Sequence, residues 1–137
     1  MSSLVRFGVS LEEKLLKRFD EFIKKKGYNN RSEAIRDLIR QKIVTEEWDE
    51  DKEVVGVIVL VYDHEKRELP DELIDFQHKY CYNIISSMHI HLDEHNCLET
   101  IIIRGKANTV KEIANQLISI KGVKHGELIK TSTGKEL

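Results

Sequence analysis

The chain has 137 residues, with 22 Lys and Arg against 24 Asp and Glu, a size that fits one domain or two small ones. Its two cysteines are too few for a disulfide framework, no run resembles a signal peptide, and the longest apolar run, residues 54–62, cannot span a bilayer. These features exclude a disulfide-rich secreted domain and an integral membrane protein, and they predict a cytoplasmic protein with reduced thiols and no membrane partner.

The charge is unevenly distributed along the chain. Residues 1–45 carry eleven Lys and Arg against six Asp and Glu, a net charge of +5, whereas residues 46–137 carry a net charge of −7. A basic front followed by an acidic remainder predicts different partners for the two halves.

The first part of the chain shows one strand pattern followed by two helix patterns. In residues 4–11, apolar and polar side chains alternate, which indicates a half-buried strand. The apolar residues then recur at helical spacing until Gly27, which is typical of a glycine just past a helix end. Asn30 followed by Glu33 indicates the capped start of a second helix, which we expect to continue to about Trp48.

One strand and two helices in fewer than fifty residues cannot bury this much apolar surface alone. A lone strand also leaves both hydrogen-bonding edges unpaired, so we expect it to pair antiparallel with the same strand of a second chain. The side chains on the exposed face of this ribbon are those of Arg6, Gly8 and Ser10. A two-stranded ribbon of this kind fits the major groove of double-stranded DNA.

The sequences VRFGVSL and GYNNRSEAIRDLIR resemble a ribbon-helix-helix DNA-binding domain, a β-α-α unit in which two chains form an interwound dimer. The resemblance implies that Arg6, Gly8 and Ser10 read bases and that Arg36 contacts a DNA phosphate. Gly8 departs from the hydroxyl residue expected there, because it has no side chain that could donate or accept a hydrogen bond. Recognition at that position is therefore expected to be weaker, or the operator to differ.

The remainder of the chain alternates between strand and helix patterns. After an acidic tract we expect a strand buried on both faces at Val54–Tyr62, a helix from Asp71 to about Ser87, hairpin strands at Met88–Asp93 and Cys97–Arg104, a helix at Ala107–Ile120 and a last strand at Val123–Lys130. This β-α-β-β-α-β order predicts a ferredoxin-like, ACT-like unit and an α+β fold class. The expected domains are residues 1–48 and 54–137, joined by a linker at 49–53.

The segment MHIHLDEHNCLE contains a predicted metal site. His89 and His91 are two residues apart, so their side chains share one face of a strand. If residues 93–96 form the hairpin turn, Cys97 folds back opposite His91 on that face. Two imidazoles and a thiolate suit nickel, copper or zinc and do not suit magnesium or calcium. His78 is a fourth candidate ligand, within the chain or from a partner subunit; the alternative is solvated histidines beside a buried cysteine.

The two halves together resemble the nickel-responsive transcriptional regulator family. The sequences NRSEAIRD, YDHEKREL, QHKY, HIHLDEHNCLE and KGVKHG occur in the expected order along nearly the whole chain. The resemblance implies one Ni²⁺ ion per subunit at the centre of a homotetramer. It implies that nickel is bound in a square plane by His89, His91 and Cys97 of one subunit and by His78 of a neighbour.

Further roles follow from the resemblance at other positions. Tyr62, Gln77 and Glu99 match residues that orient the metal ligands, although Gln77 and Glu99 are as readily interpreted as polar surface residues. Glu33 and Asp37, one helical turn apart, match carboxylates that bind K⁺ or another hard cation between the two domains. The alternative is a helix cap at Glu33 and an ion pair at Asp37. Carbonyl oxygens complete the implied cation site at positions matching Ile118, Ile120 and Val123.

The resemblance implies a DNA-binding regulator rather than an enzyme, and no Ser-His-Asp set or phosphate loop occurs in the sequence. We expect a dimer of dimers that binds a palindromic operator and represses nickel-uptake genes when nickel is bound. Nickel is expected to order residues 63–73, where Lys66 and Arg67 are phosphate contacts or, equally, solvated charges. The alternative is a ribbon-helix-helix repressor that answers a different metal or a small molecule.

The other cysteine, which has no role in the resemblance, and the remaining histidines lie outside the implied nickel site. Cys81 lies three residues after His78 and is interpreted as a packing residue. His64 and His95 are interpreted as surface residues, with an auxiliary low-affinity metal site as the alternative. His125 is interpreted as structural.

Overall fold

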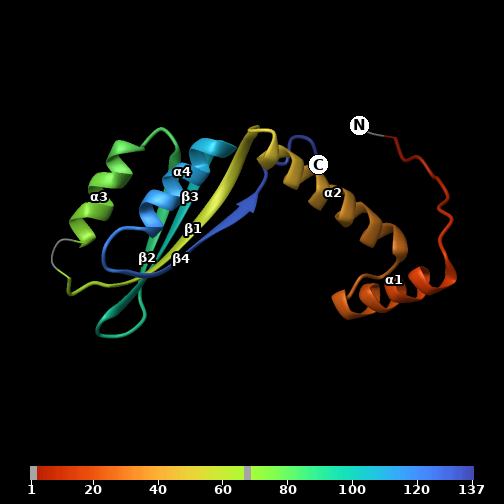
Figure 1. The fold of residues 1–137 in the computed structure, drawn as a ribbon, viewed down its shortest axis with the longest axis horizontal. Coiled ribbons are helices and arrows are strands. Elements are labelled where there is room, and N and C mark those ends of the chain that lie inside the picture. Colours follow the sequence, from red (N-terminus) through yellow and green to blue (C-terminus); the bar gives the residue numbers. More distant parts are fainter. Residues whose placement is uncertain (1–2, 67–68) are drawn as a thin grey trace. The chain divides into compact units, whose positions relative to one another are not determined.

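The computed structural model describes residues 3–66 and 69–137. It divides the chain into two compact units, Met1–Arg40 and Gln41–Leu137, which we call the N-terminal and C-terminal units (Figure 1). No helix within the described residues is long and apolar enough to cross a membrane. The predicted domain limits, which differ from this division, stay a prediction: 1–48, 49–53 and 54–137.

Helices account for most of the N-terminal unit, which contains α1 (Glu13–Lys26) and the first part of α2 (Arg31–Asp49). α1 ends at Gly27, whose φ of 78° is left-handed and whose N–H reaches carbonyls in the last turn, as predicted for a glycine past a helix end. α2 begins after Asn30, whose side-chain oxygen accepts the Glu33 N–H at 2.9 Å. This bond confirms the predicted capped start.

Residues 3–12 form no strand within the single chain. Their alternate apolar side chains are exposed, with Phe7 at 69% and Val9 at 58% of full exposure. The predicted strand needs a second chain as its hydrogen-bonding partner, so the ribbon and the interwound dimer stay predictions. Contiguous apolar exposure of this kind is typical of a surface that another chain covers.

Within its described residues, the C-terminal unit consists of the last part of α2, a four-stranded antiparallel sheet and two further helices. Its elements are β1 (Glu53–Asp63), α3 (Leu69–Lys79), β2 (Ile84–His91), β3 (Asn96–Lys106), α4 (Ala107–Ile118) and β4 (Val123–Thr131). The strand order β2-β3-β1-β4 places β1 and β3 at the centre of the sheet. This β-α-β-β-α-β order confirms the predicted ferredoxin-like, ACT-like unit and the α+β class.

Helices α3 and α4 cover one face of the sheet (Figure 1). The even-numbered residues of β1 from Val54 to Tyr62 are buried beneath them, together with Ile101 and Ile103 of β3. The odd-numbered residues of β1 are only half-buried on the other side, so the prediction of a strand buried on both faces is wrong for the single chain. We call that side the open face, and its apolar side chains are Val55, Val57, Val59, Val61, Met88, Ile90, Leu98, Ile102 and Ile129.

The predicted helix over residues 71–87 is wrong at its C-terminal end. α3 ends at Lys79, and β2 already begins at Ile84. At the junction, the Asn83 carbonyl accepts the Arg104 N–H at 2.8 Å, and the Asn83 amide donates to the Arg104 carbonyl at 3.1 Å. These bonds attach the chain to β3, and the β-branched residues that follow Asn83 favour a strand.

Gly126 of β4 lies directly against α4. A Cβ at this position would be 2.6 Å from Ile118 Cγ1 and 3.1 Å from Leu60 Cδ2. We therefore expect Gly126→Ala to lower the free energy of unfolding by about 1–3 kcal/mol, measured by urea denaturation. Gly8→Ala is the control, because a Cβ at Gly8 meets no atom within 4 Å. Equal stability of the two variants would contradict this packing.

Candidate metal centre

The hairpin between β2 and β3 places His91 directly opposite Cys97, in the register predicted from the sequence. The Asp93 carboxylate closes the hairpin turn, because it accepts hydrogen bonds from the N–H groups of His95 at 2.8 Å and Asn96 at 2.7 Å. The Asn96 side chain and these two N–H groups lower the pKa of the Asp93 carboxyl to about 2. Asp93 is therefore ionised at neutral pH, and its hydrogen bonds hold His91 and Cys97 in register.

Cys97 is fully buried, and its Sγ lies 3.4 Å from Nδ1 of His91. Burial, together with the carboxylates of Asp93, Glu99 and Asp63, raises the pKa of the Cys97 thiol. Without a bound cation the side chain is therefore a neutral thiol at pH 7. A metal ion that binds this sulfur displaces the thiol proton to solvent.

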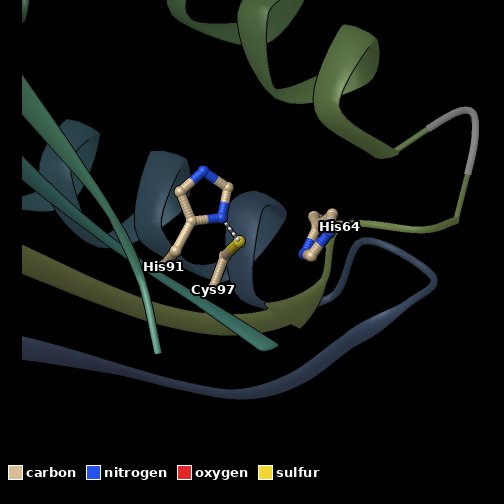
Figure 2. A group of neighbouring side chains, drawn as sticks. All are labelled: His64, His91 and Cys97. Atoms are coloured by element: carbon tan, nitrogen blue, oxygen red, sulfur yellow. Dashed lines mark hydrogen bonds between the residues drawn. The ribbon is translucent and has the colours of Figure 1, made fainter. Parts of the chain in front are cut away.

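Figure 2 shows that His64 lies beside Cys97, on the side of the sulfur away from His91. One ligand atom from each of these three residues lies within 4.8 Å of the other two. The His64 and His91 rings are nearly perpendicular, at 89°, with centroids 5.3 Å apart. His64 is half-buried in this group, so its interpretation as a surface residue is wrong. His64 follows by two residues Tyr62, the β1 partner of Cys97, so its place beside Cys97 depends on the pairing of β1 with β3 and had no local signal in the sequence.

His89 is held by a hydrogen-bond network on the same face. Its Nδ1 lies 2.9 Å from the Tyr62 hydroxyl, which donates to Glu99 Oε2 at 2.9 Å. Gln77 Nε2 donates to the other Glu99 oxygen at 2.9 Å. Because the one hydroxyl proton goes to Glu99, His89 donates from Nδ1 to the Tyr62 oxygen and keeps the lone pair of Nε2 for a further partner.

Tyr62 and Glu99 of this network are buried, whereas the His89 side chain is exposed. Glu99 is only 7% exposed, so its interpretation as a polar surface residue is wrong. Burial of Tyr62 and its hydrogen bond to Glu99 raise the pKa of the Tyr62 hydroxyl. The rings of His89 and His91 have centroids 4.9 Å apart. Tyr62 and Glu99 therefore contact His89, and Gln77 contacts Glu99, whereas the role of all three in orienting metal ligands stays a prediction.

The fourth predicted ligand, His78, lies apart from the group around Cys97. His78 lies near the C-terminal end of α3, is exposed, and is not part of the group around Cys97. Its role as a ligand from another subunit stays a prediction. Cys81 is also exposed, so its interpretation as a packing residue is wrong. His95 Nδ1 lies 3.1 Å from Glu65 Oε2, and both side chains are exposed.

The residues predicted to contact DNA are exposed wherever the structure describes them: Arg6, Gly8, Ser10, Arg36 and Lys66. The Arg36 guanidinium donates from Nε to the Ser32 carbonyl one turn earlier, at 3.4 Å. Arg67 lies outside the described residues. Their contacts with DNA stay predictions.

The two predicted cation-binding carboxylates have partners within the N-terminal unit. Glu33 Oε2 accepts the Asn29 N–H at 3.3 Å. Asp37 accepts the Tyr28 hydroxyl at 2.7 Å and lies 3.6 Å from Arg40 Nη1. These contacts agree with the alternative of a helix cap and an ion pair. The carbonyls predicted to complete the cation site belong to the C-terminal unit: Ile118, Ile120 and Val123.

Two family models match the chain. The NikR C terminal nickel binding domain matches residues 55–131, and the ribbon-helix-helix protein model of the copG family matches residues 5–46. A relative from Caldanaerobacter subterraneus subsp. tengcongensis, named "Putative nickel-responsive regulator", is 60% identical over 100% of this chain and 90% of its own length. A relative of the same name from Thermococcus kodakarensis is 58% identical over 98% of both chains.

One solved structure, of an uncharacterized protein from Thermotoga maritima, matches 58% of this chain and 98% of its own with a TM-score of 0.52. Its sequence identity is 11%, so the likeness concerns the fold alone. The two family models and the full-length relatives together establish the family. The chain belongs to the NikR family of nickel-responsive regulators, which are transcriptional regulators and not enzymes, and it joins a ribbon-helix-helix DNA-binding domain to a nickel-binding domain.

Proposed function

We propose that this regulator binds a palindromic operator in double-stranded DNA as a homotetramer, a dimer of dimers, when one Ni²⁺ ion per subunit is bound. The proposed ligands are His89, His91 and Cys97 of one subunit and His78 of a second subunit. The proposed output is repression of nickel-uptake genes in the cytoplasm. The observation that carries the proposal is the pairing of His91 with Cys97 beside a tethered His89, in a chain with a ribbon-helix-helix domain.

The donor atoms fit nickel. Imidazole nitrogen and thiolate sulfur are ligands that borderline transition metals prefer over hard oxygen ligands. The 3.4 Å between Cys97 Sγ and His91 Nδ1 is close to the separation of neighbouring ligands around one metal, roughly 3.0–3.6 Å. Nickel, when bound, would hold the thiolate and join two subunits. The network from Tyr62 to Glu99 fixes which His89 nitrogen is free to bind.

Two apolar surfaces support the association of subunits. The side chains of Phe7 and Val9 are exposed in the N-terminal unit, where a partner strand would cover them. On the open face, Met88, Ile102 and Ile129 are exposed although they lie on a sheet. Pairing through the first surface would build the DNA-binding dimer, and packing through the open face would build the tetramer.

Nickel changes DNA binding only if it binds the DNA-competent arrangement of subunits more tightly than the others. A ligand from a second subunit supplies that difference, because His78 reaches the site in one arrangement only. In the proposal, that arrangement also brings Lys66 and Arg67 to DNA phosphates. A hard cation such as K⁺, bound by Glu33 and Asp37 and by the carbonyls of Ile118, Ile120 and Val123, is a further part of the proposal.

An absorption titration of the metal-free protein with nickel tests the proposal. We expect a thiolate-to-nickel charge-transfer band and the d–d bands of planar nickel, which saturate at one metal per subunit. Cys97→Ala should abolish the charge-transfer band. Cys81→Ala is the matched control and should leave it intact, because Cys81 is exposed and lies outside the group around Cys97. If the band survives in Cys97→Ala, the proposed ligand set is wrong. The alternative function, a regulator that responds to a different metal or to a small molecule, would then be favoured.

Tyr62→Phe removes the hydroxyl that links His89 to Glu99 but keeps the buried ring. We expect the nickel affinity to fall by about 10–100-fold, because His89 loses the partner that fixes its ring and its tautomer. Isothermal titration with nickel measures the change. Tyr80→Phe is the matched control, since the Tyr80 hydroxyl donates to Gln116 Oε1 and contacts no proposed ligand. Equal affinities for the two variants would contradict the role of Tyr62.

A further inference from the structure

We propose that residues 44–53, from the last turns of α2 to the first residue of β1, are fixed on the C-terminal unit and are not a flexible linker. We call these residues the anchor. Any change in the orientation of the N-terminal unit then takes place earlier in α2, before Val44. The inference goes beyond the proposed function, which requires a rearrangement of subunits but assigns it no place in the chain, and it does not depend on that function.

The indole of Trp48 fixes the last turn of α2. Trp48 is 2% exposed within the core cluster of the C-terminal unit, and Val44, one turn earlier, packs against the same cluster. The Trp48 Nε1–H donates to the Thr131 carbonyl at 2.8 Å, and the Trp48 carbonyl accepts a hydrogen bond from the Lys111 ammonium at 3.4 Å. Because Trp48 precedes residues 49–53, a hinge there would move this ring out of the core together with the N-terminal unit. Burial of the ring therefore opposes bending at 49–53.

The chain that follows β4 holds the neighbouring residue of α2. Glu47 is 8% exposed, and its carboxylate accepts a hydrogen bond from the Ser132 hydroxyl at 2.9 Å. The Ser132 hydroxyl oxygen in turn accepts the Gly134 N–H at 3.1 Å. The last turn of α2 is thus bonded both to β4, through Trp48, and to the residues after β4, through Glu47.

Asp51 joins the anchor to the start of α4. The residue before α4, Lys106, makes no capping hydrogen bond with its side chain. Instead, the Asp51 carboxylate accepts the Asn108 N–H at 2.8 Å, and its negative charge is favourable at a helix N-terminus. The next carbonyl, that of Lys52, accepts the Ala107 N–H at 2.9 Å. Bending the chain here would take these partners away from the first two N–H groups of α4.

Just before the anchor, α2 is exposed to solvent. The boundary between the two units falls after Arg40, and the side chains of Arg40, Gln41 and Lys42 are exposed. Arg40 lies 3.6 Å from Asp37, one turn earlier in the same helix. Segments with few buried contacts open and bend most easily. Residues 40–42 are therefore where the N-terminal unit changes its orientation.

Digestion of the full-length protein with a lysine-specific protease compares two exposed sites in one experiment. Lys42 lies in the exposed part of α2, whereas Lys52 lies in the anchor, where its N–H also donates to the Glu47 carbonyl at 2.9 Å. Proteases cleave chain that has opened locally, so we expect cleavage after Lys42 to be at least about tenfold faster than after Lys52. Mass spectrometry of the fragments over time measures both rates. Faster cleavage after Lys52 would overturn the proposal, because a flexible linker at 49–53 predicts that order.

Two substitutions of Asp51 test its contact with α4. Asp51 has a left-handed φ of 55°, which glycine adopts freely, so Asp51→Gly removes only the carboxylate. We expect cleavage after Lys52 to become about tenfold faster in this variant. Asp51→Asn is the matched control and should keep the wild-type rate, because its amide oxygen can still accept the Asn108 N–H. Equal rates in the two variants would also overturn the proposal, and far-UV circular dichroism verifies that each is folded.

The digestion requires neither nickel nor DNA, so its outcome is distinct from that of the proposed function. If the nickel titration of the wild-type protein fails, the proposed function is wrong and the order of cleavage still decides the anchor. If Lys52 is cleaved before Lys42, the anchor is wrong and the nickel ligand set is unaffected.

Discussion

Replacing Trp48 with alanine should lower the free energy of unfolding of the C-terminal unit by about 3–5 kcal/mol. Trp48 is 2% exposed within the core cluster, and its Nε1–H donates to the Thr131 carbonyl at 2.8 Å. The Lys130 ammonium lies 5.6 Å from the ring centroid. Truncation removes the buried ring, leaves a cavity and breaks the hydrogen bond to β4.

Urea denaturation followed by far-UV circular dichroism measures this loss, because the substitution removes the only tryptophan and its fluorescence. Tyr82→Ala is the control, since the Tyr82 side chain is 98% exposed and its removal should change the stability by less than about 0.5 kcal/mol. A cost below about 1 kcal/mol for Trp48→Ala would contradict the burial of this ring.

Ile102→Lys should dissociate the proposed tetramer. Ile102 lies on β3 in the middle of the open face, opposite Val57, and is 37% exposed in the single chain. If the open face packs against another subunit, the substitution places an unpaired charge in an apolar interface. We expect this to cost about 3 kcal/mol or more, which is over a hundredfold in the dissociation constant.

Sedimentation velocity at micromolar protein concentration measures the effect as a fall in mass from that of four chains. Asn115→Lys adds the same charge at an exposed position of α4, which lies on the opposite side of the sheet from the open face, and should leave the mass unchanged. Ile102→Lys should also weaken nickel binding, because His78 of a second subunit would no longer be held at the site. A wild-type mass for Ile102→Lys would exclude the open face as the tetramer interface.

The local features of the site could be predicted because local hydrogen bonds determine them. The turn that Asp93 closes is a short polar tract between two strand patterns, so the pairing of His91 with Cys97 follows from the hairpin alone. The helix end at Gly27 and the cap at Asn30 were predictable for the same reason.

Features that depend on distant contacts could not be read from the chain. α3 ends early because Asn83 bonds to Arg104, twenty-one residues away. The run Val54–Tyr62 is apolar on both sides, and only the positions of α3 and α4 show which side is covered within the chain. His64 stands outside the histidine motif and reaches Cys97 only because the end of β1 is bonded to the hairpin turn.

Selection of sequences from a random pool of double-stranded DNA, with nickel and with a chelator, tests most directly whether nickel controls DNA binding. The wild-type protein with nickel should enrich palindromic sequences, and the same protein with chelator should enrich none. Cys97→Ala should behave as the chelated protein does even when nickel is present, whereas Cys81→Ala should behave as wild type. Two results would contradict nickel control of DNA binding through Cys97. One is enrichment of the same sequences by the wild-type protein with and without nickel, and the other is enrichment of these sequences by Cys97→Ala in the presence of nickel.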